Sequence, residues 1–188
     1  MRDILAVDWS ALPVPTDDGL ARHLLGKSLP NLALMSTDGD LVDLSLLNGR
    51  VVVYAFPRMH RPDRPVLDGW YVIPGAPGCT PQSCAFRDHA EQLKSAGAAH
   101  IFGLSTQDTS YQREAVGRLH LPFPLLSDDQ RSFTKALSLP TFEAAGMVLL
   151  KRLTLIIKSG TIEHVFYPVF PPDQNATEVL AWLEQHPH

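Results

Sequence analysis

The strongest constraint on the fold is an uninterrupted apolar run, Val-Val-Val-Tyr-Ala-Phe, at residues 51–56. Its valines are β-branched and favour an extended backbone. A strand with one face in solvent alternates apolar and polar residues, whereas a run that is apolar at every position suits a strand buried on both faces. We therefore expect residues 51–56 to form a central strand of a sheet that is covered on both sides.

Helical and extended patterns alternate along the rest of the chain. Phe86, Ala90 and Leu93 fall at helical spacing, which predicts one amphipathic helix from about residue 80 to a C-terminal glycine at Gly97. Other extended or helical segments are expected at 32–34, 41–44, 100–105, 111–119, 153–157 and 162–167. The order predicts an α/β fold, with helices on both faces of a central β-sheet that is mixed because it ends in a hairpin.

Two helix starts have expected capping residues. Ser127 and Gln130 have capping-box spacing for a helix that runs to about residue 137. Asn175 is expected to cap the last helix, with Glu178 three residues further along.

A chain of 188 residues fits one domain with additions. We expect residues 1–25 to be a leader segment packed on the body, and residues 26–188 to be the domain. Its 16 prolines cluster in loops, and residues 57–77 form a long proline-rich excursion of the kind that is usually functional or mobile. Within it, Trp70 and Tyr71 either line a pocket or fasten the loop to the body, and the sequence leaves both readings open.

Charge and hydropathy exclude several classes of protein. The net charge of −4 argues against a nucleic-acid binder, which usually has a clustered basic excess. No apolar run approaches the ~20 residues that span a bilayer, so no membrane segment is expected. The N-terminal residues lack a basic and then apolar signal pattern, which predicts a cytoplasmic protein.

The chain has two cysteines, Cys79 and Cys84, too few for a disulfide scaffold. Cys79 follows a proline- and glycine-rich loop, and Pro81 suits the first turn of a helix. Free backbone N–H groups and the positive end of the helix dipole would then point at the sulfur of Cys79 and stabilise a thiolate, the nucleophilic form. Cys79 is therefore the candidate reactive residue.

The role of Cys84 is less constrained. In one helix the two Cα atoms would be roughly 8–9 Å apart, beyond the ~7 Å limit for a disulfide. A disulfide between them therefore requires local unwinding of the helix. Two such thiols are typical of a redox site in which one thiol is oxidised and the other resolves it. Cys84 also suits simple packing inside the helix. A zinc site with His89 is disfavoured, because residues five apart diverge around a helix.

At this point the sequence resembles a known family. The segment Cys79-Thr-Pro-Gln-Ser-Cys-Ala-Phe-Arg-Asp88 is similar to the active-site helix of the peroxiredoxins, most of all the PrxQ or bacterioferritin comigratory protein branch, which shares the C-x4-C spacing. Residues 26–34, the turn at 38–39, the run at 51–57 and the corner at 121–128 extend the resemblance. It covers about residues 26–183.

The resemblance implies a thioredoxin-like fold and a thiol peroxidase that needs no metal or organic cofactor. It implies Cys79 as the peroxidatic cysteine, Cys84 as the resolving one, and Arg152 as the arginine that holds the thiolate and the peroxide. Read without the resemblance, Arg152 is a strand-end cation beside Lys151. The expected partners are a peroxide and a thioredoxin or glutaredoxin-like reductant, and the expected assembly is a monomer or homodimer.

The sequence departs from the family motif Pro-x-x-x-Thr-x-x-Cys. Ala76 occupies the threonine position, so the hydroxyl is missing, and Pro57 is separated from Cys79 by the 58–73 insertion. This leaves a non-catalytic or weakly active redox sensor or binding module on the same fold as an alternative. A thiol–disulfide oxidoreductase is a further alternative, disfavoured because its usual motif is C-x-x-C.

Overall fold

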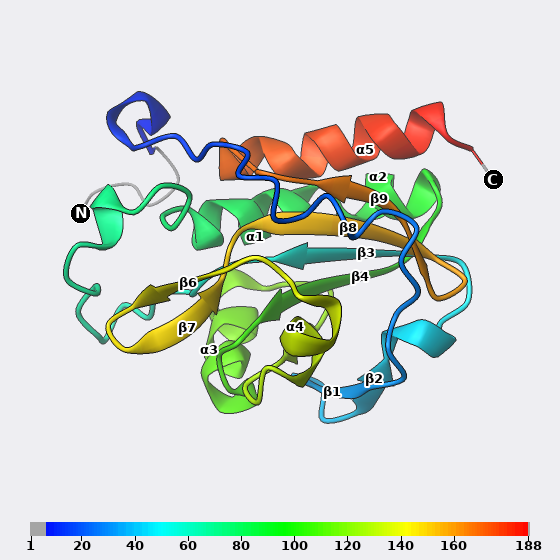
Figure 1. The fold of residues 1–188 in the computed structure, drawn as a ribbon, viewed down its shortest axis with the longest axis horizontal. Coiled ribbons are helices and arrows are strands. Elements are labelled where there is room, and N and C mark those ends of the chain that lie inside the picture. Colours follow the sequence, from blue (N-terminus) through cyan, green and yellow to red (C-terminus); the bar gives the residue numbers. More distant parts are fainter. Residues whose placement is uncertain (1–6, 188) are drawn as a thin grey trace.

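The computed structural model describes residues 7–187, and it is built around a seven-stranded sheet (Figure 1). The strand order is β2-β1-β5-β4-β3-β8-β9. The strands are β1 (Ala33–Ser36), β2 (Leu41–Asp43), β3 (Arg50–Ala55), β4 (Ala98–Ser105), β5 (Leu125–Ser127), β8 (Leu153–Lys158) and β9 (Thr161–Phe166). β3, β4 and β5 are parallel, and their neighbours run antiparallel, which confirms the mixed sheet.

The central strand β3 is buried at every position. Val52 and Tyr54 face one core cluster, whereas Val51 and Val53 face the other. Successive side chains of a strand point to opposite faces, so an apolar run serves both cores at once. This confirms the expectation drawn from residues 51–56.

Helices cover both faces of the sheet. They are α1 (Cys79–Asp88), α2 (Ala90–Ser95), α3 (Thr109–Leu119), α4 (Ser132–Leu137) and α5 (Asn175–Gln185). Side chains from α1, α2, α3 and α5 enter the first core cluster, and those from α4 enter the second together with Leu24. The right-handed crossovers between β3, β4 and β5 place α1, α2 and α3 on the same face.

The single helix expected over residues 80–96 is two helices. The break lies at His89, whose φ of −98° and ψ of 2° leave the helical region. The backbone N–H of His89 and its ring Nδ1 both approach the carbonyl of Ala85, at 3.1 and 2.9 Å. The side chain thus shares the acceptor of the backbone, and the chain starts a new helix at Ala90.

Both expected caps are wrong. Ser127 lies in β5 and donates to the carbonyl of Gln107, so it does not begin a helix. Asp128 instead accepts from the backbone N–H groups of Phe133 and Thr134, at 3.1 and 2.8 Å. Asn175 makes no capping bond, because its side chain is directed into the interior.

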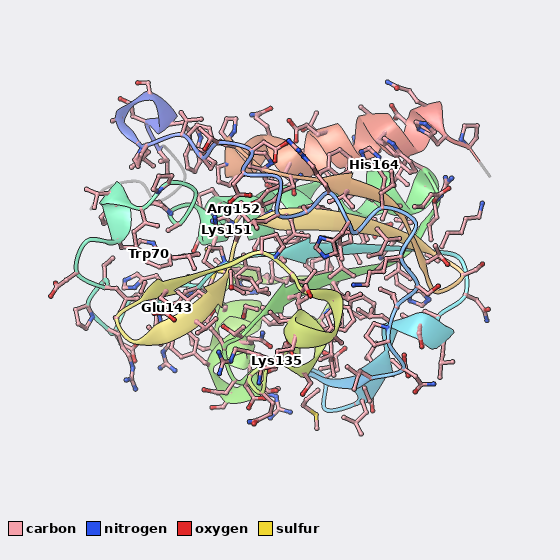
Figure 2. All side chains as sticks on the ribbon, viewed as in Figure 1. Trp70, Lys135, Glu143, Lys151, Arg152 and His164 are labelled. Atoms are coloured by element: carbon pink, nitrogen blue, oxygen red, sulfur yellow. The ribbon has the colours of Figure 1, made fainter. Side chains whose placement is uncertain are left out.

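A two-stranded sheet, β6 (Thr141–Ala144) and β7 (Met147–Leu150), was not expected from the sequence. It forms a third apolar cluster with the 58–73 insertion, in which the rings of Trp70 and Phe142 lie 6.3 Å apart. Figure 2 shows Trp70 beside this hairpin. Trp70 therefore fastens the insertion to the body, whereas Tyr71 is 58% exposed.

The described part of the leader runs over the body, drawn in blue in Figure 1. Trp9 Nε1 donates to Asp173 at 2.8 Å, and Asp18 accepts from Lys151 and from the hydroxyl of Tyr167. Residues 1–6 of the expected leader lie outside the described residues, and the division of the chain at residue 25 stays a prediction. Within residues 7–187, no helix is long and apolar enough to cross a membrane.

Candidate active site

Cys79 is the first residue of α1, and Gly78 before it makes this position possible. Gly78 has a φ of +109°, and a Cβ there would lie 2.6 Å from Pro172 and 2.8 Å from Trp9. Only glycine adopts this conformation without strain and leaves room for those neighbours. The sharp turn sets Cys79 at the helix start, where backbone N–H groups have no helical acceptor.

The sulfur of Cys79 lies beside a buried cation. Nη2 of Arg152 is 3.3 Å from Cys79 Sγ, although 73 residues separate them in the sequence. The thiol also lies 3.7 Å from the carbonyl of Ala76. Both side chains are nearly buried, so the guanidinium acts on the sulfur with little screening by water. This contact stabilises negative charge on Cys79.

Arg152 is held from two sides. Its Nη2 lies 3.3, 3.1 and 3.2 Å from the carbonyls of Gly75, Ala76 and Pro77, in the loop before α1. Its Nη1 donates to Oε1 of Gln82 on α1, at 2.5 Å. The planar fork of arginine suits several acceptors at fixed angles, which a lysine would not satisfy.

Cys84 lies on the same helix as Cys79, and both are free, buried thiols. Burial raises the pKa of the Cys84 thiol, an effect that the nearby Arg87 guanidinium opposes. With α1 intact, the two Cα atoms are roughly 8–9 Å apart. The reduced helix therefore holds the two thiols apart, as the sequence spacing predicts.

Tyr54 of β3 packs against α1, and no sequence pattern indicated it as a site residue. Its hydroxyl lies 3.1 Å from Oγ of Ser83, and its ring stacks on Phe86 with centroids 4.3 Å apart. Burial raises the pKa of Tyr54 well above its usual value, so the hydroxyl stays protonated. The sequence showed Tyr54 only as one more apolar position of the central strand.

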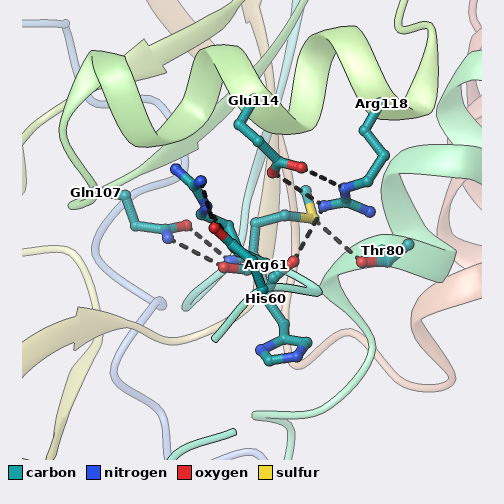
Figure 3. Close-up of polar contacts among 8 residues, drawn as sticks. His60, Arg61, Thr80, Gln107, Glu114 and Arg118 are labelled. Atoms are coloured by element: carbon teal, nitrogen blue, oxygen red, sulfur yellow. Dashed lines mark hydrogen bonds and ion pairs between the residues drawn. The ribbon is translucent and has the colours of Figure 1, made fainter. Parts of the chain in front are cut away.

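The start of the insertion is anchored beside the site (Figure 3). The side-chain amide of Gln107 bonds to both the N–H and the carbonyl of Met59, at 2.7 and 3.1 Å. Oγ1 of Thr80 lies 3.3 Å from the sulfur of Met59, and Arg118 joins Glu114 to the carbonyl of His60. The insertion is thereby tied to α1 and α3. No sequence pattern indicated these contacts.

The position of the missing hydroxyl is filled by an apolar contact. Ala76 is fully buried in the cluster that contains Trp70 and Leu149, and its carbonyl accepts from Arg152. A pocket of about 300 Å³ adjoins this loop, and its lining includes Gly75, Arg152 and the Asp18–Lys151 pair. Trp70 and Cys79 do not line it.

The residues weighed for a zinc site do not form one. His89 directs Nδ1 to the carbonyl of Ala85. Among residues 7–187, no three His, Cys, Asp or Glu side chains are grouped to hold a metal ion.

A central mixed sheet, a cysteine at a helix start and a guanidinium against its sulfur define a class, the thiol-based redox proteins of thioredoxin-like fold. Comparison with known proteins supports this class, since residues 24–180 match the Redoxin family. Peroxiredoxin Q, chloroplastic, from Oryza sativa subsp. japonica is 32% identical over 177 residues, which cover 91% of this chain and 74% of that protein.

Solved structures agree with the sequence relatives. Peroxidoxin BcpB from Mycobacterium tuberculosis superimposes with a TM-score of 0.70 at 25% identity, covering 87% of this chain and 98% of that one. Reduced Prx3 from Vibrio vulnificus in complex with hydrogen peroxide gives a TM-score of 0.66 at 26% identity, covering 86% and 96%. The chain belongs to the redoxin family, in the peroxiredoxin Q and bacterioferritin comigratory protein branch of the peroxiredoxins. Its relatives indicate a thiol peroxidase.

Proposed function

We propose that this protein reduces hydrogen peroxide or organic hydroperoxides through Cys79. The thiolate of Cys79 attacks one peroxide oxygen and the O–O bond breaks. Cys79 becomes a sulfenic acid, and the other oxygen takes a proton and leaves as water or an alcohol. The observation that carries the proposal is the 3.3 Å contact between Arg152 Nη2 and Cys79 Sγ.

Arg152 has two tasks in this scheme. It stabilises the thiolate before the reaction, and it stabilises the charge that develops on the leaving oxygen. Its guanidinium suits both because it stays protonated and presents several N–H donors in one plane. The Arg152 side chain therefore acts on both the Cys79 sulfur and the peroxide.

The second step is the return of Cys79 to the thiol. The Cys84 thiol attacks the sulfenic sulfur, a disulfide forms, and water leaves. The first turns of α1 must unwind for this, because the helix holds the thiols too far apart. A dithiol donor such as thioredoxin or a glutaredoxin-like protein then reduces the disulfide by exchange and is itself oxidised.

Location and assembly are part of the proposal. The peroxiredoxin Q relatives from rice and poplar are described as chloroplastic. For this chain the cytoplasmic location and the monomeric or dimeric state stay predictions. Cell fractionation and sedimentation of the reduced protein test them.

Stopped-flow addition of peroxide to the reduced protein, with thiol loss as the signal, tests the function. We expect fast thiol loss, about a hundredfold slower in Arg152→Lys because the fork of donors is lost. Lys158→Ala, at the exposed far end of β8, is the control that keeps the rate. Slow loss in the unmodified protein would favour a redox sensor, and reduction of insulin disulfides would favour a thiol–disulfide oxidoreductase.

A further inference from the structure

A chain of buried polar side chains stands behind Arg152. Arg152 Nη1 donates to Gln82 Oε1 at 2.5 Å, and Gln82 Nε2 donates to Asn175 Oδ1 at 3.1 Å. The hydroxyl of Thr154 donates to the same Asn175 oxygen at 2.6 Å. Gln82, Asn175 and Thr154 are fully buried, and Arg152 is 3% exposed. We call these three neutral residues the relay; they come from α1, α5 and β8.

The cation sets the direction of every bond in the relay. A guanidinium has donors only, so Gln82 must present its oxygen to Arg152. The Gln82 NH₂ group then points away and needs an acceptor. Asn175 Oδ1 is that acceptor, and the Thr154 hydroxyl, which also donates to it, holds it in place.

Asn175 has no structural reason to be polar apart from this task. It does not cap α5, and its Nδ2 is buried without a hydrogen-bond partner among the described residues. An unpartnered buried N–H₂ group is destabilising, so a residue kept there for packing alone would be apolar. The relay explains why an oxygen acceptor stands at this position, because Gln82 and Thr154 both donate to Oδ1 of Asn175.

We propose that Asn175 and Thr154 are positioning residues for the peroxidase reaction. They fix the orientation of the Gln82 amide, and Gln82 fixes the guanidinium that faces Cys79. Without the Asn175 oxygen, the Gln82 NH₂ group loses its acceptor, and the Gln82 side chain is free to leave its position beside the guanidinium. This inference rests on the proposed function and extends the site to the first residue of α5.

The test compares variants that keep or remove the oxygen. Asn175→Ala removes it, and Asn175→Asp keeps an acceptor for Gln82 and Thr154. Val179→Ala, a buried α5 residue outside the relay, is the control for general loss of packing. The readouts are the rate constant with hydrogen peroxide, the rate of Cys79 alkylation by iodoacetamide in a Cys84→Ser background, and the melting temperature.

We expect Asn175→Ala to slow both reactions about tenfold, because the guanidinium loses its fixed geometry. Asn175→Asp should return both rates most of the way, and Val179→Ala should keep them although its melting temperature falls. Equal rates in Asn175→Ala and the unmodified protein would overturn the inference. So would a slowing of Val179→Ala equal to that of Asn175→Ala.

A second pair of variants serves if Asn175→Ala does not fold. Thr154→Val loses the hydroxyl at nearly constant volume, and Thr154→Ser keeps it. The inference expects slower Cys79 alkylation in the first and a near-normal rate in the second, and equal rates would contradict it. If the unmodified protein fails to react with peroxide, the proposed function fails, whereas iodoacetamide alkylation still reads the contact between Arg152 and Cys79.

Discussion

Asp18 and Lys151 form an ion pair at 2.5 Å that joins the leader to the residue next to Arg152. Asp18 also accepts from the hydroxyl of Tyr167 at 2.8 Å. The leader is therefore fastened beside the segment that carries the guanidinium of the candidate site. The stability of this attachment should depend on the negative charge of the Asp18 carboxylate.

The first prediction concerns this carboxylate. Burial raises the pKa of Asp18, but hydrogen bonds from Lys151, the Leu20 N–H and Tyr167 outweigh it and lower the pKa from 3.8 to about 2. A lowered folded-state pKa gives stability that is full above pH ~4 and is lost as the pH falls toward 2. We expect Asp18→Asn to lower the urea midpoint at pH 7.

The same measurement at lower pH gives the check. The difference in urea midpoint between Asp18→Asn and the unmodified protein should stay constant from pH 7 to about 4 and then shrink. Asp17→Asn is the matched control, because among residues 7–187 the Asp17 carboxylate accepts a hydrogen bond only from the Gly19 N–H, and asparagine keeps that oxygen. A difference that grows in acid would show that Asp18 is not held as a carboxylate by these partners.

The second prediction concerns Gly78. Gly78→Ala should destabilise the protein by about 2 kcal/mol or more, since it adds strain at positive φ to a clash. The clash is with Pro172 and Trp9. Gly26→Ala is the control, because Gly26 has a φ of +77° with nothing within 4 Å of an added Cβ. Urea denaturation should show the larger loss for Gly78→Ala; equal losses would mean that Pro172 and Trp9 move aside easily.

The third prediction concerns motion in α1. Pro81 donates no backbone hydrogen bond, and the first turn depends on contacts such as Gln82 to Arg152 and Ser83 to Tyr54. A disulfide between Cys79 and Cys84 must break these contacts. Amide exchange across residues 79–86 should therefore be faster in the oxidised protein, while residues 90–94 change little.

Mass spectrometry must confirm the disulfide in the same sample. Equal protection of residues 79–86 in both states, with the disulfide present, would mean that the thiols were already adjacent. We expect residues 90–94 to change little because they lie in a separate helix, α2, which begins after the break at His89.

The sequence predicted those parts of the fold that local chemistry determines. The run at residues 51–56 is apolar on both faces, so only a central buried strand satisfies it. The contact of Arg152 with Cys79 came from the family resemblance, because local pattern shows only a cation before a strand. Ser127 and Asn175 match capping patterns, but in the fold both side chains form hydrogen bonds with residues far away in the sequence instead.

Long-range polar contacts are what the sequence did not reveal. Gln82 and Asn175 meet although 93 residues separate them, and neither residue type is unusual where it stands. Met59 and Gln107 likewise meet only because the insertion folds back on β4 and α3. Such pairs follow from the packing of whole elements, so periodicity and motif spacing carry no signal for them.

The central claim is that Cys79 is the thiol that peroxide oxidises first. Cys79→Ser and Cys84→Ser, each treated with one equivalent of hydrogen peroxide and trapped with dimedone, test it by peptide mass spectrometry. The account predicts a dimedone adduct on Cys79 in Cys84→Ser, and no rapid adduct on Cys84 in Cys79→Ser. An adduct on Cys84 together with an unmodified Cys79 would contradict the account.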